Sequence, residues 1–171
     1  GFFVEELTQA GFTSTFGFAV HEPRSVVTCG YQGTLGFGFP TALGVKFGNP
    51  DKAVVSICGD GGFMFGVQEL ATAAQYGIGL VTIVFNNSAF GNVKRDQQTR
   101  YDGHFIGSEL QNPDFVALAD SFGVDSYWVD RPEDLQKSLK AALAKDVPAL
   151  IEVKTDQASE TSPWKFIVQR K

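Results

Sequence analysis

Short runs of β-branched and aliphatic residues alternate along the chain with longer segments whose apolar residues recur at helical spacing. This alternation is typical of parallel βαβ units. The apolar runs predict strands at Ser25–Cys29, Ala53–Cys58, Leu80–Phe85, Asp125–Val129 and Ala149–Val153. The intervening segments predict helices at Thr34–Gly48, Phe63–Tyr76, Pro113–Phe122 and Pro132–Lys145. The central strands are apolar on both sides, as a sheet between two helix layers requires. The pattern therefore predicts an α/β fold with a doubly wound, mostly parallel sheet and helices on both faces.

The length of the chain and the pattern near its C-terminal end predict the domain organisation. A chain of 171 residues has the size of one domain with a single core. The region after Asp156 has neither helical nor strand periodicity. We therefore expect one domain over residues 1–171, of which residues 157–171 form a C-terminal arm.

Charge and polarity argue against two classes of partner. Fourteen Lys and Arg against nineteen Asp and Glu give a net charge of −5, which repels nucleic acid and anionic membrane surfaces. Two long uncharged stretches, Ser25–Val45 and Leu70–Val93, are interrupted by glycine, proline or amide residues. Neither stretch has the continuous apolar character of a membrane span. We expect no nucleic-acid partner and no membrane partner.

The cysteines bear on the cellular compartment. Cys29 and Cys58 each end an expected strand, and two cysteines are too few for a disulfide scaffold. We expect both to be inert buried thiols in a reducing compartment. The chain opens without the basic and apolar regions of a signal peptide. These features together favour a cytoplasmic location.

The main chemical signal follows the strand that ends at Cys58. Gly59-Asp60-Gly61-Gly62 lies between this strand and the next expected helix, where backbone N–H groups and the helix dipole favour a phosphate. A carboxylate beside a phosphate repels it, so Asp60 indicates a divalent cation between the two. Taken alone, the Gly-Asp-Gly sequence is equally compatible with an ordinary turn.

A second polar pair follows the next strand. Leu80–Phe85 leads directly into Asn86-Asn87, and parallel neighbouring strands end at the same edge of a sheet. Because such strands lie about 4.8 Å apart, Asp60 and Asn87 are expected to converge on one ion. Carboxylate, amide and carbonyl oxygens together with phosphate oxygens match the preference of Mg²⁺. The sequence thus predicts a phosphate and magnesium site at this edge.

Two familiar nucleotide motifs do not fit this segment. A dinucleotide fingerprint built on Gly59 and Gly61 requires a third glycine at the position of Met64. The Lys-Ser/Thr pair of a P-loop is also missing from the segment. A nucleotide-dependent oxidoreductase also needs an acid about twenty residues after the glycines, and no acid lies between Glu69 and Asp96.

The spacing of Gly59-Asp60-Gly61 and Asn86-Asn87 resembles the thiamine-diphosphate motif of the acetolactate synthase, benzoylformate decarboxylase and pyruvate decarboxylase superfamily. Other segments resemble the same superfamily: Gly30–Pro40, Gln68–Ala73, Asn112–Phe115 and Pro132–Leu135. The resemblance covers nearly the whole chain. It implies the diphosphate-binding domain of an acetolactate synthase-like decarboxylase or carboligase that acts on a 2-oxo acid and uses thiamine diphosphate and Mg²⁺.

The resemblance also implies roles for individual residues. The implied magnesium ligands are Asp60, the side chain of Asn87 and the carbonyl oxygen of Ala89. The implied diphosphate-binding residues are Gly61, Gly62, Phe90 and Gly91. Leu35 corresponds to the bulky residue on which the cofactor bends, and the carbonyl oxygen of Gly33 to the acceptor for its 4′-amino group. Gln9 aligns with a glutamine near the phosphates, with a position on a surface helix as the alternative.

The resemblance places the catalytic glutamate elsewhere. In the superfamily this residue belongs to a separate pyrimidine-binding domain, which a second subunit supplies across a dimer interface. We therefore expect no catalytic residue on this chain, and we expect a pyrimidine-binding partner domain and a homo-oligomer. Glu69 is not the counterpart of that glutamate, because its Gln-Glu-Leu context places it in the helix after the metal aspartate.

Two positions depart from the family pattern. Asp96 stands where acetolactate synthases carry a tryptophan, and Val93 stands where pyruvate decarboxylases carry an acid. The choice between decarboxylase and carboligase therefore stays open. A catalytically silent assembly or regulatory domain that retains the fold is an alternative function, and the presence of both Asp60 and Asn87 argues against it.

Overall fold

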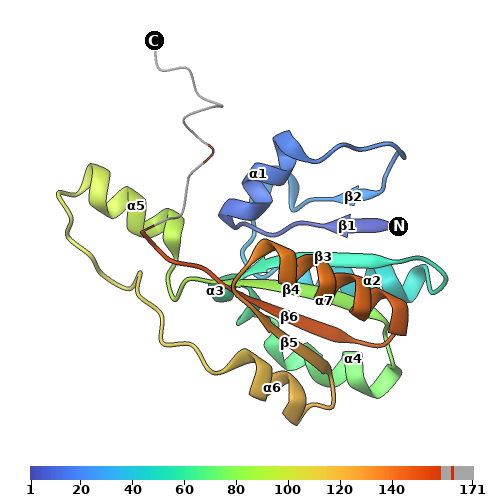
Figure 1. Cartoon of the computed structure of the whole chain (residues 1–171). Helices are drawn as coiled ribbons and strands as arrows, with labels where there is room; N and C mark the ends of the chain where they lie inside the picture. The colour runs from blue at the N-terminus through green and yellow to red at the C-terminus, as the bar shows by residue number, and fades with distance from the viewer. Residues whose placement is uncertain (159–162, 164–171) are drawn as a thin grey trace.

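The computed structural model describes residues 1–158 and Pro163, which form one six-stranded sheet covered by helices (Figure 1). The strands are β1 (Phe2–Val4), β2 (Val26–Val27), β3 (Val54–Gly59), β4 (Leu80–Asn86), β5 (Asp125–Val129) and β6 (Ala149–Lys154). Their order across the sheet is β2-β1-β3-β4-β6-β5, and every neighbouring pair is parallel. This confirms the predicted α/β fold with a doubly wound sheet.

Seven α-helices lie within the described residues. They are α1 (Gln9–Gly17), α2 (Gly38–Gly48), α3 (Asp60–Phe63), α4 (Leu70–Tyr76), α5 (Gly91–Arg100), α6 (Phe115–Ser121) and α7 (Pro132–Lys145). Two short 3₁₀ turns, η1 (Gly30–Gln32) and η2 (Val67–Glu69), precede α2 and α4. The expected arm of residues 157–171 lies outside the described residues except for Gln157, Ala158 and Pro163.

Two separate cores show how the helices cover the sheet. One core joins α2, α4 and α6 to one face, with Phe39, Leu70 and Phe115 among its buried side chains. The other joins α7, through residues such as Ala142, to the opposite face. Successive residues of β3 point to the two cores in turn, because side chains alternate across a strand. The central strands are therefore apolar on both sides, as the sequence pattern requires.

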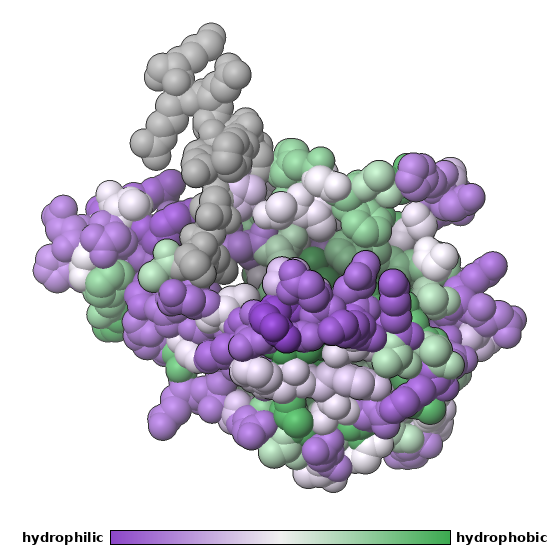
Figure 2. All heavy atoms as spheres, in the orientation of Figure 1, coloured by the Kyte–Doolittle hydropathy of each residue, from purple (hydrophilic) through white to green (hydrophobic). Residues whose placement is uncertain are grey.

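The surface of this arrangement is mixed in polarity. Figure 2 shows hydrophilic residues over the outer side of α7 and a more hydrophobic region over α1. Phe16, Phe18 and Val20 at the end of α1 are all exposed. Among the residues that the structure describes, no helix has the length and apolar character needed to cross a membrane.

Several predicted boundaries are corrected by the structure. The strand expected at Ser25–Cys29 is reduced to the two residues of β2, and the half-buried Cys29 lies outside it. The helix expected from Thr34 begins only at Gly38, because Gly33 and Gly36 adopt positive φ angles of 59° and 86° that exclude a right-handed helix.

The expected helix Phe63–Tyr76 is divided into α3, η2 and α4. Its interruption lies at Gly66, whose φ and ψ of −124° and 13° are not helical. Gly66 also packs closely against Pro40, because a Cβ atom at this glycine would lie 2.8 Å from the proline ring. Contact with α2 therefore divides a segment whose sequence is helical in character.

Three elements are missing from the sequence-based prediction. Strand β1 has only three residues, and it exists because β2 and β3 pair with it on both sides. Helix α1 contains glycine, threonine and serine, which favour helices weakly. Helix α5 has no buried residue and therefore no apolar face for a periodicity analysis to detect.

Candidate functional site

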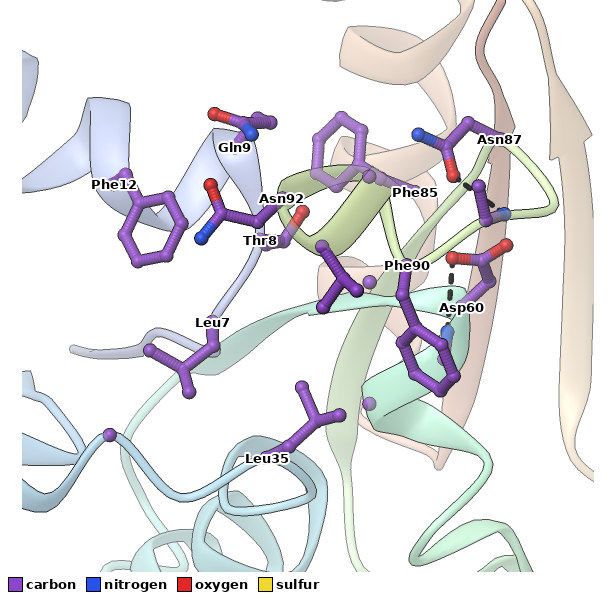
Figure 3. Close-up of a pocket in the computed structure, with 17 residues that line it drawn as sticks. Leu7, Thr8, Gln9, Phe12, Leu35, Asp60, Phe85, Asn87, Phe90 and Asn92 are labelled. Carbon is purple, nitrogen blue, oxygen red and sulfur yellow. Dashed lines mark hydrogen bonds between the residues drawn. The ribbon is translucent and has the colours of Figure 1, made fainter. Parts of the chain in front are cut away.

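The candidate site lies where the strand connections change direction. Strands β1 and β3 are neighbours, but the chain leaves β1 toward β2 on one side and leaves β3 toward β4 on the other. Such a switch point at the carboxyl edge of a parallel sheet is the usual position of a ligand crevice. A cavity of about 370 Å³ lies there, lined by Leu7 and Thr8 after β1 and by Gly59–Gly62 at the end of β3 (Figure 3).

All nine residues that the sequence analysis assigns to the site line this cavity. They are Gly33, Leu35, Asp60, Gly61, Gly62, Asn87, Ala89, Phe90 and Gly91. They come from three separate segments of the chain, which the parallel sheet brings to one edge. Figure 3 shows Asp60 and Asn87 at one end of the cavity and Leu7 and Leu35 at the other. The carboxylate and amide at one end are thus separated from the two leucine side chains at the other.

Asp60 is almost completely buried, with 2% of its surface exposed. Its Oδ1 accepts a hydrogen bond from the Gly61 backbone N–H at 3.0 Å. Its Oδ2 accepts from the Ser88 backbone N–H at 2.8 Å and from Nδ2 of Asn112 at 2.7 Å. Burial raises the pKa of this carboxyl group, and these three hydrogen bonds oppose the rise. A cation beside Asp60 would favour the charged form.

The two asparagines at the end of β4 have different surroundings. Asn86 is tied to the sheet, because its Nδ2 donates to Oε1 of the buried Glu152 on β6 at 2.6 Å. Asn87 lines the cavity, and its Oδ1 accepts a hydrogen bond from the Ala89 backbone N–H at 3.1 Å. The structure therefore separates an asparagine that supports the sheet from one that faces the candidate site.

The backbone around Ala89 leaves its carbonyl group outside the local strand pairing. Ala89 and Glu109 form an isolated antiparallel bridge, made by hydrogen bonds from Phe90 N–H to Ser108 and from Leu110 N–H to Ser88. In a bridge of this kind the N–H and C=O groups of the central residue point away from the partner strand. The carbonyl group of Ala89 thus points away from Glu109, and Ala89 itself lines the cavity.

Two glycines of the cavity wall leave no room for a side chain. A Cβ atom on Gly61 would lie 2.4 Å from the ring of Phe90. A Cβ atom on Gly62 would lie 3.1 Å from Cγ of Glu6 and 3.4 Å from a methyl group of Leu35. The backbone of α3 is therefore packed directly against the side chains of Phe90, Glu6 and Leu35.

Sequence reasoning missed two polar residues that support the site. Asn112 precedes α6 and reaches back to Asp60, although its sequence signal was only an Asn-Pro pair before a helix. Glu6 is the second residue after β1 and has 2% of its surface exposed. Neither is close in sequence to the glycines or asparagines of the motif, so spacing alone could not reveal them.

Gln9 and Gln157 also approach the site. Gln9 begins α1, lines the cavity and is 9% exposed, so the alternative of a surface position for it is wrong. Gln157, at the start of the expected arm, donates from Nε2 to the backbone carbonyl of Asn87 at 2.8 Å. Lys94 of α5 donates to both Gln157 and Glu109. The loop after β4 is thus held by α5 and by the chain that follows β6.

A cavity at the carboxyl edge of a parallel sheet, beside glycines that begin a helix, is the usual arrangement of α/β domains that bind phosphorylated cofactors. Residues 8–153 match the family model for the thiamine pyrophosphate enzyme, C-terminal TPP binding domain. The chain belongs to this family. Its cofactor is therefore thiamine diphosphate, as the sequence motif indicated.

Several relatives extend this assignment. The chain is 39% identical over 146 residues to the mitochondrial acetolactate synthase catalytic subunit of Aspergillus candidus, covering 85% of this chain and 21% of that protein. It is 38% identical over 146 residues to the probable acetolactate synthase large subunit of Methanococcus aeolicus, covering 85% of this chain and 24% of that protein. The chain thus spans about a quarter of the length of these relatives.

A solved structure shows the same fold. The thiamine diphosphate-dependent 4-hydroxybenzoylformate decarboxylase of Rhodococcus jostii RHA1 superposes with a TM-score of 0.84 and 34% sequence identity. The match covers 91% of this chain and 29% of that chain. The six-stranded domain described above therefore corresponds to one part of a larger thiamine diphosphate-dependent enzyme.

Proposed function

We propose that this domain binds the diphosphate of thiamine diphosphate through a magnesium ion held by Asp60, Asn87 and the carbonyl oxygen of Ala89. The observation that carries the proposal is that Asp60 and Asn87 lie at one end of a cavity that Ala89 and several glycines also line. Carboxylate, amide and carbonyl oxygens are hard ligands of the kind that Mg²⁺ prefers, and phosphate oxygens and water complete its coordination.

The rest of the cavity suits the apolar part of the cofactor. Leu35 lies at the opposite end from Asp60, and in this proposal its side chain is the bulky support on which the cofactor bends. Gly33 adopts a left-handed conformation with φ of 59°, which directs the chain around that end of the cavity. In this proposal Gly61, Gly62, Phe90 and Gly91 surround the diphosphate, and the Gly33 carbonyl oxygen accepts a hydrogen bond from the aminopyrimidine.

We further propose that the whole protein is an acetolactate synthase-like enzyme that decarboxylates or joins 2-oxo acids. When bound, thiamine diphosphate supplies an electron sink for carbanion chemistry. The residues of this chain would hold and bend the cofactor and would hold the magnesium ion that offsets the charge of its phosphates. Glu6 and Glu69 do not line the cavity, which agrees with a catalytic glutamate on a pyrimidine-binding domain from a second subunit.

Calorimetric titration of the chain with thiamine diphosphate, with Mg²⁺ or with a chelator, tests the metal site. We expect binding only with Mg²⁺, because the buried Asp60 carboxylate otherwise repels the diphosphate. Asp60→Asn should abolish this binding, whereas Asp51→Asn, at an exposed position, should not change it. Equal binding with and without metal would refute the magnesium site and leave a silent assembly domain as the better description.

Hydrogen exchange at C2 of the cofactor tests the expected partner. The isolated chain should not accelerate this exchange, because no acidic side chain among its described residues lines the cavity beside Leu35. Addition of a pyrimidine-binding domain from a homologous enzyme should accelerate it. Rapid exchange with the isolated chain would place the catalytic acid on this chain after all.

A further inference from the structure

Glu6 is a buried carboxylate with an unusual set of partners. Its Oε2 accepts a hydrogen bond from the Gly38 backbone N–H at 2.7 Å, and its Oε1 accepts from the Gly36 backbone N–H at 3.0 Å. These glycines are 30 and 32 positions away in the sequence. Isolated burial of a carboxylate is costly, and these two donors, together with a longer hydrogen bond from the Leu7 backbone N–H at 3.4 Å, offset that cost.

The hydrogen bond from Gly38 also completes the N-terminus of helix α2. The helix begins at Gly38, and the residue before it, Phe37, provides no capping side chain. The first N–H groups of a helix need acceptors from elsewhere, and the helix dipole favours a negative charge at this end. Glu6 therefore caps α2 from a distant part of the chain.

Glu6 also packs against helix α3, which forms part of the cavity wall. A Cβ atom on Gly62 of α3 would lie 3.1 Å from Cγ of Glu6. On its other side, Gly36 packs against Phe65, because a Cβ atom on Gly36 would lie 2.6 Å from Cβ of Phe65. The segment Gly33–Gly38 is thus held between Glu6 and the chain that follows α3.

We propose that Glu6 is a positioning residue that fixes the segment Gly33–Gly38 relative to α3 and so sets where Leu35 and the Gly33 carbonyl group meet the cofactor. This inference rests on the proposed function. Glu6 does not line the cavity, so we expect no direct contact between its side chain and the cofactor. Its effect reaches the ligand through the backbone of the segment that it holds.

The proposal predicts an effect on one half of the ligand only. In the proposed function the diphosphate and its metal contact Asp60, Asn87 and their neighbours, whereas Glu6 accepts hydrogen bonds from the backbone of Leu7, Gly36 and Gly38. The bent organic part of the cofactor contacts Leu35 and Gly33. Loss of the Glu6 hydrogen bonds should therefore weaken binding of the whole cofactor and leave binding of its diphosphate portion unchanged.

The test compares two ligands on the Glu6→Gln variant. A glutamine has nearly the same volume, but its NH₂ group cannot accept the second backbone hydrogen bond. We expect affinity for Mg²⁺ and thiamine diphosphate to fall about tenfold, as for loss of one strong hydrogen bond, and affinity for Mg²⁺ and inorganic diphosphate to stay within twofold. Glu5→Gln is the matched control, because Glu5 accepts hydrogen bonds from the hydroxyl groups of Ser14 and Thr15 instead.

Amide hydrogen exchange provides a readout that needs no ligand. The N–H groups of Gly36 and Gly38 should exchange about tenfold faster in Glu6→Gln, whereas amides in the middle of β4 should be unchanged. If Glu6→Gln does not fold, Glu6→Asp is the second variant, because it keeps the charge but is too short to reach both donors. For Glu6→Asp we also expect weaker binding of thiamine diphosphate and unchanged binding of inorganic diphosphate.

The outcomes separate this inference from the proposed function. Equal weakening for both ligands, or no weakening of thiamine diphosphate binding, would overturn the positioning role. If the unaltered chain binds neither ligand, the proposed function fails, and the exchange experiment still decides whether Glu6 holds the segment. Unchanged exchange at Gly36 and Gly38 would then overturn the inference about Glu6.

Discussion

Nδ2 of Asn112 lies 2.7 Å from Oδ2 of Asp60, although 52 positions separate the two residues in the sequence. The same nitrogen lies 3.0 Å from Oδ1 of Asn86, whose own amide nitrogen donates to Glu152. A continuous path of hydrogen bonds therefore links β6 to the carboxylate at the end of β3. This path orients Asp60 in the absence of any ligand.

Asn112→Ala should weaken magnesium-dependent binding of thiamine diphosphate about tenfold, because Asp60 loses the donor that orients Oδ2. The free energy of unfolding should fall by about 1 kcal/mol for the same reason. Calorimetry and denaturant unfolding measure the two effects. Gln111→Ala, at the exposed neighbouring position, is the control. Unchanged affinity in Asn112→Ala would mean that the backbone N–H groups of Gly61 and Ser88 suffice to hold the carboxylate.

Leu35→Ala should cost little stability, because Leu35 is half-buried at the cavity wall. We expect a loss of about 1 kcal/mol or less in the free energy of unfolding. Leu150→Ala is the matched control, because Leu150 is fully buried in β6 and its truncation should cost about 2–5 kcal/mol. Denaturant unfolding of both variants without ligand compares them. A loss as large as that of Leu150→Ala would assign Leu35 to the core instead of the cofactor.

Gly61→Ala should destabilise the domain and weaken diphosphate binding, because the new methyl group would lie 2.4 Å from the Phe90 ring. Crowding of this kind costs about 1–3 kcal/mol. Gly44→Ala should instead stabilise α2 by up to about 1 kcal/mol, since its new methyl group would meet no atom within 4 Å beyond the backbone of its own helix and its chain neighbours. Thermal unfolding distinguishes the two substitutions. Addition of Phe90→Leu to Gly61→Ala should recover part of the loss, and no recovery would place the crowding elsewhere.

The pH dependence of the free energy of unfolding should reveal the raised pKa of the buried Glu6. Burial raises the pKa of Glu6 above its ordinary value of 4.5, although hydrogen bonds from Gly38, Leu7 and Gly36 oppose the rise. The folded chain then binds this proton more tightly than the unfolded chain does. The stabilisation that this proton gives the folded chain is complete below 4.5, the ordinary pKa of the glutamate. It is lost as the pH rises through the higher pKa that Glu6 has in the folded chain.

Glu6→Gln should remove this contribution, so its free energy of unfolding should fall less steeply than that of the unaltered chain above pH 4.5. Denaturant unfolding without metal at a series of pH values measures the difference in slope. The neighbouring Cys58 does not titrate in this range, because burial raises the pKa of its thiol to about 12. Parallel stability curves for the two chains would show that Glu6 titrates normally.

The local pattern of hydrophobic residues was sufficient to predict the strands and helices that bury residues at regular spacing. The apolar runs in β3 and β4 marked two central strands, and Pro132 followed by two acids marked the start of α7. The strand ends then predicted that Asp60 and Asn87 would share one edge, because parallel strands end together. These features follow from backbone periodicity and from rules that act over a few neighbouring residues.

Tertiary structure alone decided the elements and contacts that have no local signal. Strand β1 has three residues and depends on its two neighbours for pairing, and α5 buries no residue at all. Two side chains hold the site from distant parts of the sequence. Glu6 accepts hydrogen bonds from the backbone of Gly36 and Gly38, which are 30 and 32 positions away. Asn112 donates to Asp60, which is 52 positions away. A hydrogen bond between such distant groups depends on how the sheet and helices pack, and it leaves no periodicity in the sequence on either side.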